Sequence, residues 1–176
     1  MTRSSAPLTL ELTLLGILDR TPMHGYNLFK AVCDLDGFGL IWKVKQSALY
    51  ALLDKLEAQG LVVGNLITGE AHPSRREFRV TPAGREALAA WMGAPVDSIR
   101  SMRQDFFARL YFCRREGPGK ALDLVERQRA ACRIWQADVQ AKLEASGDYT
   151  RVVLTHRLHI IRATLAWMDD YERTLA

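Results

Sequence analysis

The chain has 176 residues, of which 48% are hydrophobic, and this is enough apolar material for one large or two small packed cores. Its apolar stretches stay short of the roughly 18 to 20 residues that a membrane-spanning helix needs, so we expect no integral membrane protein. The net charge is +4, and charged residues of both signs occur throughout the chain, with 10 basic and 9 acidic residues in 1–92 and 14 and 11 in 93–176, so bulk charge does not locate a nucleic-acid site.

The N-terminal segment and the cysteines indicate a cytoplasmic protein. Residues 1–7 contain one arginine but no sustained apolar region followed by a small-residue cleavage site, so we expect no export signal. The cysteines are odd in number, lie far apart and have apolar surroundings, which favours buried thiols in a reducing compartment over disulfides or a zinc site. They are Cys33, Cys113 and Cys132.

Three helices are expected before residue 60. The first runs from about Leu8 to Leu18, and the second begins at His24 and ends at the glycine-containing run 36–39. The third, over 46–59, has leucines at i, i+3, i+4 and i+7 and is followed by Gly60, a residue that helix C-termini favour. The leucines of this stripe are Leu49, Leu52, Leu53 and Leu56.

A β-hairpin and a fourth helix are expected next. Residues 61–80 contain two segments with strand patterns, separated by a turn-rich tip over 68–75. Thr81-Pro82 has the order of a helix cap followed by a first-turn proline. The run Gly93-Ala94-Pro95 then interrupts the pattern, so we predict that a first domain covers residues 1–92.

Residues 97–176 are predicted to form a helical domain. One helix is expected from Asp97 or Ser98 to Arg115, a second reaches about Ala145, and the last follows a turn at 146–148. The second and third should form a long antiparallel pair, and the third carries apolar residues at alternating spacings of four and three. We assign this stripe to dimerisation, with packing inside one chain as the alternative. It consists of Leu154, Leu158, Ile161, Leu165 and Met168.

Three short helices followed by a hairpin are the element order of a winged helix-turn-helix. The predicted fold class is therefore mainly α with a small β-hairpin wing, followed by a C-terminal antiparallel helical dimerisation domain. In a winged helix the third helix enters the major groove of DNA, and the wing approaches the backbone or the minor groove. The side chains around these two elements that can bind base edges or phosphates are Lys43, Lys45, Gln46, Ser47, Tyr50, Lys55, Arg75 and Arg76.

Each of these residues also has a simpler interpretation. Amphipathic helices commonly expose tyrosine, serine and lysine to water, and Arg75 and Arg76 are equally compatible with solvated charges at a wing tip. Tyr50 can also pack in part against the wing. Their joint placement at the two elements that a winged helix turns toward DNA favours the DNA-binding interpretation.

Three motifs resemble the PadR family of transcriptional regulators. They are His24-Gly25-Tyr26, then Leu49-Tyr50-x-x-Leu53-x-x-Leu56-Glu57-x-x-Gly60-Leu61, and finally Arg76-x-Phe78-x-Val80-Thr81-x-x-Gly84. The resemblance covers residues 8–92 closely and the rest more loosely, and Trp42-Lys43 with 99–110 is similar to the branch that contains AphA-type virulence activators. The chain departs from the family at Ala51 and at Gln46-Ser47, where many members have proline or glycine, so individual base contacts are not carried over.

The resemblance implies a homodimeric transcriptional regulator that binds a pseudo-palindromic operator in double-stranded DNA. Some PadR-like repressors respond to phenolic or planar compounds, so it also suggests a small aromatic effector; a winged helix used only for protein–protein contacts is the alternative function. The sequence has no nucleophile-base set, phosphate loop or metal cluster of specific spacing, so we expect neither an enzyme nor a cofactor. Aromatic residues near the domain junction could line an effector pocket or simply pack in the core: Trp91, Phe106, Phe107, Tyr111 and Trp135.

Overall fold

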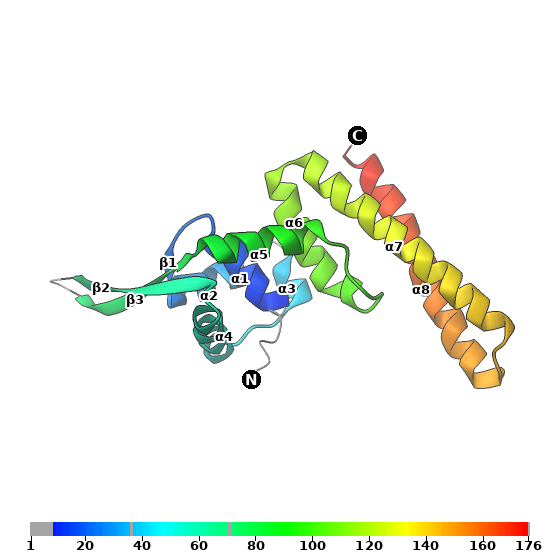
Figure 1. Ribbon diagram of the computed structural model, residues 1–176, viewed down its shortest axis with the longest axis horizontal. Coiled ribbons are helices and arrows are strands. Elements are labelled where there is room, and N and C mark those ends of the chain that lie inside the picture. Colours follow the sequence, from blue (N-terminus) through cyan, green and yellow to red (C-terminus); the bar gives the residue numbers. More distant parts are fainter. Residues whose placement is uncertain (1–8, 36, 70–71, 176) are drawn as a thin grey trace. The chain divides into compact units, whose positions relative to one another are not determined.

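A computed structural model describes residues 9–35, 37–69 and 72–175. The chain divides into two compact units, Met1–Met92 and Gly93–Ala176, which we describe separately (Figure 1). Leu8, where we expected the first helix to begin, lies outside the described residues. Within the described ranges, no helix combines the length and the apolar character that crossing a membrane requires.

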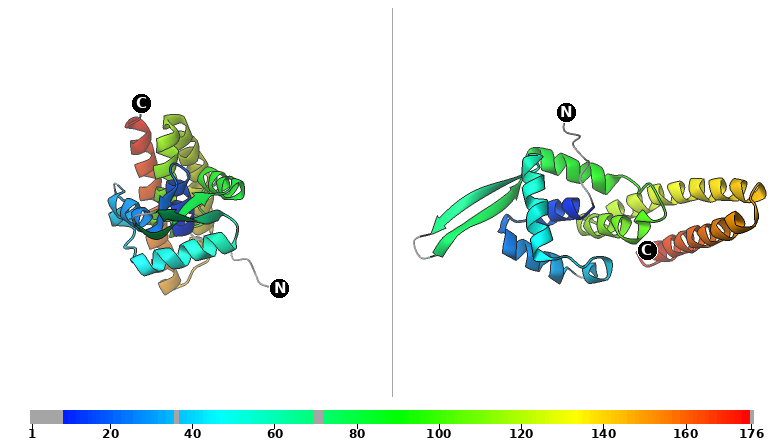
Figure 2. Two further views of the ribbon diagram at one scale, coloured as in Figure 1. Left: turned by 90° about the vertical axis from the view of Figure 1, so that its left-hand side faces the viewer. Right: turned by 90° about the horizontal axis from the view of Figure 1, so that it is seen from below.

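The first unit is a small helical body with a β-hairpin that projects from it (Figure 2, right). Its described helices are α1 (Thr9–Leu18), α2 (Gly25–Asp34), α3 (Phe38–Ile41), α4 (Gln46–Ala58) and α5 (Pro82–Gly93). Its described strands are β1 (Met23–His24), β2 (Val62–Gly69) and β3 (His72–Val80), which form an antiparallel sheet in the order β1-β3-β2. The hairpin of β2 and β3 is the wing, in which Gly64 pairs with Phe78 and Leu66 with Arg76.

Helix α4 is amphipathic as its sequence pattern predicts. Leu49, Leu53 and Leu56 are fully buried, whereas Leu52 lies at the edge of the stripe and is half-buried. Gly60 has φ of 71°, and the amides of Gly60 and Leu61 donate to the carbonyls of Glu57 and Leu56, each at 2.9 Å. These two bonds form a Schellman motif, which ends the helix and turns the chain into β2.

The start of α5 also follows the predicted pattern. Thr81 Oγ1 accepts the Gly84 amide at 3.1 Å and donates to the Gly60 carbonyl at 2.7 Å. The threonine therefore caps α5 and joins this helix to the turn that ends α4. Gly84 is the residue that allows this approach, because a β carbon there would lie 2.1 Å from a backbone oxygen of Leu61.

Two short elements of the first unit were not predicted. Strand β1 exists because Met23 and His24 pair with Phe78 and Glu77 of β3. Residues 38–41, at and after the glycine-containing run where we expected the second helix to end, form α3, in which Phe38 is buried and its ring lies 5.4 Å from that of Trp42. Glycines within this run suggested a turn, but burial of a phenyl ring favours a compact helical segment.

The second unit contains a 3₁₀ turn, η1 (Ser101–Arg103), and helices α6 (Asp105–Glu116), α7 (Pro118–Glu144) and α8 (Asp148–Arg173). Helices α7 and α8 lie side by side as a long antiparallel pair (Figures 1 and 2). The expected single helix to Arg115 is wrong, because the backbone breaks at Gln104 between η1 and α6. The predicted mainly α fold with a small β-hairpin wing and C-terminal antiparallel helices is confirmed, with one strand more than expected, whereas the dimerisation role of those helices stays a prediction.

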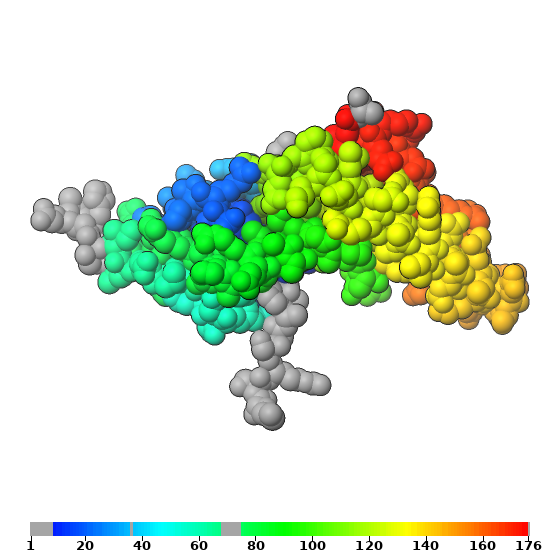
Figure 3. All heavy atoms as spheres, turned by 45° about the horizontal axis from the view of Figure 1, so that its top comes forward, coloured from blue at the N-terminus to red at the C-terminus, as the bar shows by residue number. Residues whose placement is uncertain are grey.

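The apolar stripe of α8 packs inside the chain. Ile161 and Met168 are almost fully buried, Leu154 and Leu158 are 8% and 7% exposed, and Leu165 is half-buried. Because α8 packs along α7, these side chains fill the seam between the two helices. The packing corresponds to the intrachain alternative considered above. The outer surface of α7 can be followed along the helix in Figure 3.

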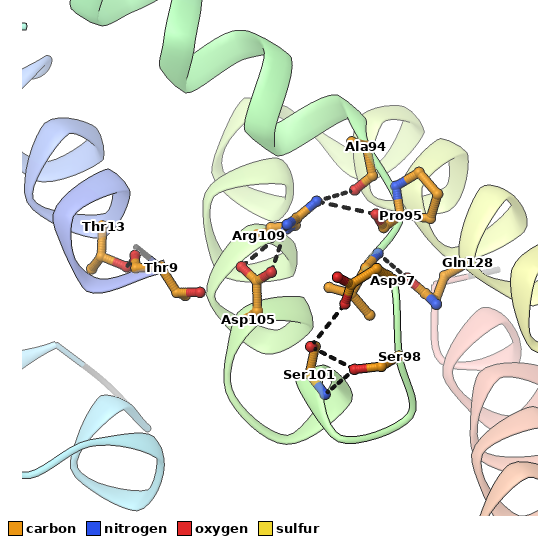
Figure 4. A network of polar contacts seen from close by, with 11 residues as sticks. Thr9, Thr13, Ala94, Pro95, Asp97, Ser98, Ser101, Asp105, Arg109 and Gln128 are labelled. Carbon is orange, nitrogen blue, oxygen red and sulfur yellow. Dashed lines mark hydrogen bonds and ion pairs between the residues drawn. The ribbon is translucent and has the colours of Figure 1, made fainter. Parts of the chain in front are cut away.

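Two buried polar residues hold the segment that leads into η1. Arg109 donates to the carbonyls of Ala94 and Pro95 at 2.6 and 3.3 Å, and its guanidinium also contacts both carboxylate oxygens of Asp105 (Figure 4). The side chain of Gln128 on α7 is fully buried and accepts the Val96 amide at 2.7 Å. These bonds satisfy backbone groups that would otherwise be buried without partners.

The cysteine prediction is correct for two residues and wrong for one. Cys113 and Cys132 are buried free thiols, and burial raises the pKa of Cys113 to about 11. Cys33 is exposed on α2, because the helix buries Leu28 and Val32 on its opposite side.

Candidate nucleic-acid interface

The exposed face of α4 carries three of the eight predicted DNA-binding residues. Burial of the leucine stripe turns Gln46, Ser47 and Tyr50 toward solvent, and 39% of the Tyr50 surface is exposed. Lys43 and Lys45 are exposed directly before the helix begins at Gln46. The first-turn amides of a helix have no intrahelical partners and favour anions, so these lysines extend an electropositive helix start.

Tyr50 lies against Gly25 at the beginning of α2. A β carbon at Gly25 would lie 2.5 Å from Tyr50 Cε1, so the tyrosine ring occupies the space that a side chain would take. His24 precedes this glycine, and its Nδ1 donates to the Arg76 carbonyl at 3.2 Å. The motif His24-Gly25 therefore joins α2 to α4 and to β3.

These contacts surround a depression of about 530 Å³ between the start of α2, helix α4 and the wing. It contains aromatic, cationic and amide groups, a combination that suits the sugars, phosphates and bases of nucleic acids. Its lining residues are His24, Gly25, Tyr26, Asn27, Tyr50, Asp54, Arg75, Arg76 and Phe78.

Lys55 is not brought together with the other candidates. Its Nζ donates to Glu11 Oε1 at 2.8 Å, and the Glu11 side chain is completely buried on α1. Only 34% of the Lys55 side chain is exposed. A charged group in a protein interior needs a charged or hydrogen-bonding partner, so the first role of Lys55 is to stabilise Glu11. The sequence pattern gave no sign of this pair, because the two residues are 44 positions apart.

The two neighbouring arginines of the wing have different surroundings. Arg76 Nη2 donates to Glu57 Oε2 at 2.5 Å, and Arg76 Nη1 lies 3.8 Å from Asp54 Oδ1. Arg75 is exposed, and among the side chains that the structure describes it has no carboxylate partner. Arg75 is therefore available to an external anion, whereas Arg76 is already paired.

Glu57 is a functional candidate that sequence reasoning missed. Its Oε1 accepts the Gly64 amide at 2.9 Å while its Oε2 accepts Arg76, so one carboxylate joins the last turn of α4 to both strands of the wing. The hydrogen bond from Arg76 and then that from the Gly64 amide lower the pKa of Glu57 below its ordinary value. The carboxylate is consequently ionised at neutral pH.

The aromatic candidates in the second unit separate into two places. Phe107 and Trp167 lie with ring centroids 5.2 Å apart, beside an apolar depression of about 370 Å³ that Ile160 also lines. Trp135 instead lines a depression of about 410 Å³ that also contains charged groups of both signs, from Arg100, Arg157, Asp97 and Asp138. The other two candidates of this unit are part of the packing, since Phe106 is fully buried and Tyr111 packs edge-on against Phe112.

Comparison with known proteins supports the family resemblance of the first unit. Residues 14–90 match the model of the transcriptional regulator PadR-like family. The negative transcriptional regulator PadR of Bacillus subtilis (strain 168) is 22% identical over 92% of this chain and 94% of its own length.

Solved structures were matched as well. The crystal structure of Bacillus subtilis PadR in complex with operator DNA is 21% identical, with a TM-score of 0.48 over 94% of this chain and 97% of that one. A PadR-like transcriptional regulator from Bacillus cereus is 19% identical, with a TM-score of 0.45 over 100% of both chains. The family match of residues 14–90 spans α2, α4 and the wing, so the winged-helix unit of this chain is similar to the PadR-like family of transcriptional regulators.

Proposed function

We propose that this chain is a dimeric regulator that binds a pseudo-palindromic operator in double-stranded DNA, with α4 in the major groove and the wing at the adjacent backbone. The observation that carries the proposal is the polar face of α4, which is exposed between exposed cations on both sides, Lys43 and Lys45 before the helix and Arg75 on the wing. The crystallised Bacillus subtilis relative has operator DNA bound, and its name describes negative regulation, so we propose repression as the direction.

The contacts follow from the chemistry of each side chain. Gln46 at the start of α4 can make paired hydrogen bonds to the N6 and N7 atoms of adenine, and Ser47 and Tyr50 can reach a base edge or a phosphate. Lys43, Lys45 and Arg75 supply charge to phosphates without reading sequence. Because Lys55 is held by a buried carboxylate, we propose no direct DNA contact for it.

The test is selection of duplexes from a random pool with the full-length chain, followed by anisotropy titrations at several salt concentrations. We expect one enriched motif with inverted symmetry. Gln46→Ala should cost about 1–3 kcal/mol at one base position and relax the preference there. Gln140→Ala is the matched control, because Gln140 is an exposed glutamine on α7. Failure to enrich any motif at low salt would contradict the proposal and favour a winged helix used for protein contacts.

We propose that a second copy binds an apolar face of α6 and α8. The α8 stripe is used inside the chain, but Phe107 and Ile160 remain 37% and 39% exposed beside Trp167 around one depression. Burial of such neighbouring side chains against a partner is favourable in proportion to the area removed from water. Light scattering should give a dimer for the wild type and a monomer for Phe107→Glu combined with Ile160→Glu. Leu40→Glu, at an exposed leucine of the first unit, should stay dimeric.

For a small aromatic effector we propose the depression around Trp135, where the indole ring lies with two arginines, Arg100 and Arg157, and two carboxylates, Asp97 and Asp138. The indole can stack on an aromatic ring, and the charged groups of both signs can hydrogen-bond a phenolic hydroxyl on that ring. A thermal-shift titration with a panel of phenols, repeated on Trp135→Ala, tests the assignment. We also propose that the protein is cytoplasmic, because its proposed partner is DNA.

A further inference from the structure

Arg75 and Arg76 are adjacent in sequence and identical in charge, yet Arg76 contacts two carboxylates and Arg75 is exposed. We infer that Glu57 is a positioning residue that clamps the wing to α4 through Arg76 and Gly64, so that Arg76 stays off the DNA and Arg75 is the phosphate contact of the pair. The inference deepens the proposed function and rests on it.

One carboxylate makes the clamp. Glu57 lies in the last turn of α4, and its two oxygens accept the Gly64 amide at 2.9 Å and Arg76 Nη2 at 2.5 Å. Gly64 is on β2 and Arg76 is on β3, so the carboxylate holds both strands to α4. The two bonds fix the wing at its base, close to where the chain leaves α4.

The side chain of Arg76 packs across the wing, over Gly64 and the ring of Phe78. Its guanidinium lies 5.2 Å from the centroid of the Phe78 ring, and a β carbon on Gly64 would come within 2.8 Å of its Nη2. The absence of a side chain at Gly64 thus leaves the surface of β2 open for Arg76 to reach Glu57. Asp54, with its carboxylate 3.8 Å away, adds a second negative charge.

The charges around Arg76 favour its contact with Glu57 over a contact with DNA phosphate. Two carboxylates surround one guanidinium, so a phosphate that approached Arg76 would meet a local excess of negative charge. The hydrogen bonds from Arg76 and Gly64 lower the pKa of Glu57, so the clamp is charged at every pH above the ordinary glutamate value. Its stabilising contribution is lost only as the pH falls through the lowered pKa of the folded state.

The number of phosphate contacts can be counted from the salt dependence of DNA binding. Each neutralised phosphate contributes about 0.9 to the slope of log affinity against log salt. We expect Arg75→Gln to reduce the slope by about 1, whereas Arg76→Gln should leave the slope unchanged while weakening affinity through a loosened wing. The probe is the duplex enriched by the wild-type chain, titrated over about 50 to 200 mM salt.

The reciprocal variant is equally specific. Glu57→Gln keeps an oxygen for the Gly64 amide but removes the negative charge that neutralises Arg76, so the slope should increase by up to about 1. Adding Arg76→Gln to Glu57→Gln should restore the wild-type slope. Arg79→Gln is the matched control, because Arg79 is on the same strand and pairs with Glu77 within it, at 2.9 Å.

A DNA-free measurement tests the clamp itself. In Glu57→Ala the Gly64 amide loses its acceptor, so its hydrogen exchange should accelerate by about tenfold, with no change in Arg79→Gln. Unchanged exchange at Gly64 would overturn the clamp. A fall of about 1 in the salt slope of Arg76→Gln would show that Arg76 contacts phosphate and overturn its exclusion from DNA. A wild-type chain that binds no duplex would instead refute the proposed function, and with it the DNA part of this inference.

Discussion

Replacement of Lys55 by alanine should unfold the winged-helix unit more readily rather than remove a DNA contact. Lys55 Nζ lies 2.8 Å from a carboxylate oxygen of Glu11, whose side chain is fully buried. The substitution leaves that carboxylate without its ammonium partner in the interior. We therefore expect the free energy of unfolding to fall.

The magnitude follows from the burial of the two partners. Breaking a fully buried ion pair by removing one member costs about 3–5 kcal/mol. Because the Lys55 side chain is 34% exposed, water can approach the pair after the substitution, and we expect the lower figure of about 2–3 kcal/mol. For a unit of about 90 residues this corresponds to a fall of about 10–20 °C in melting temperature.

Hydrogen exchange of the full-length chain is the appropriate assay, because a chain of two units need not unfold in one step. Peptides from α1 and α4 should lose protection in Lys55→Ala, and adding Glu11→Gln should restore much of it. Lys43→Ala is the control: its stability should change by no more than about 0.5 kcal/mol, while its salt slope falls. Unchanged protection in Lys55→Ala together with a lower salt slope would refute this reasoning.

Three further results are expected. Gly25→Ala should displace the Tyr50 ring, which lies 2.5 Å from the new β carbon, and lower operator affinity about tenfold in anisotropy titrations while circular dichroism stays unchanged. Gly84→Ala places a β carbon 2.1 Å from a backbone oxygen, so urea titration should show a loss of about 1–3 kcal/mol; an unaltered midpoint would contradict the packing. Exposed Cys33 should react rapidly with a disulfide reagent at pH 8, whereas Cys113, with a pKa of about 11 and only about 0.1% thiolate, should react only after denaturation.

Much of the fold could be predicted because its determinants are local. The burial of Leu49, Leu53 and Leu56 follows from their spacing on a helix of 3.6 residues per turn, and Gly60 ends that helix through its positive φ. Thr81 caps α5 by accepting the amide of Gly84, three positions ahead. Such patterns are visible in a single sequence because the interacting residues are neighbours in it.

Only part of the candidate site could be predicted from the sequence in this way. Gln46 and Tyr50 are exposed as expected, since the face opposite a buried stripe must be solvated. Arg76 and Arg75 could not be distinguished, because the difference between them is a carboxylate 19 positions away from Arg76 on another element. Tyr50 likewise depends on Gly25, which is distant in sequence and leaves the space for its ring.

The sequence by itself determined the long helices α4, α7 and α8, the wing and the polar face of α4, because periodicity, caps and turn residues act over a few positions. Tertiary structure alone decided which charges remain available: Lys55 is held by Glu11, Arg76 by Glu57, and the α8 stripe by α7. The physical reason is that a charged group pairs with, and an apolar face packs against, whichever partner the fold brings within contact. That partner is chosen by packing between distant segments rather than by spacing along the chain.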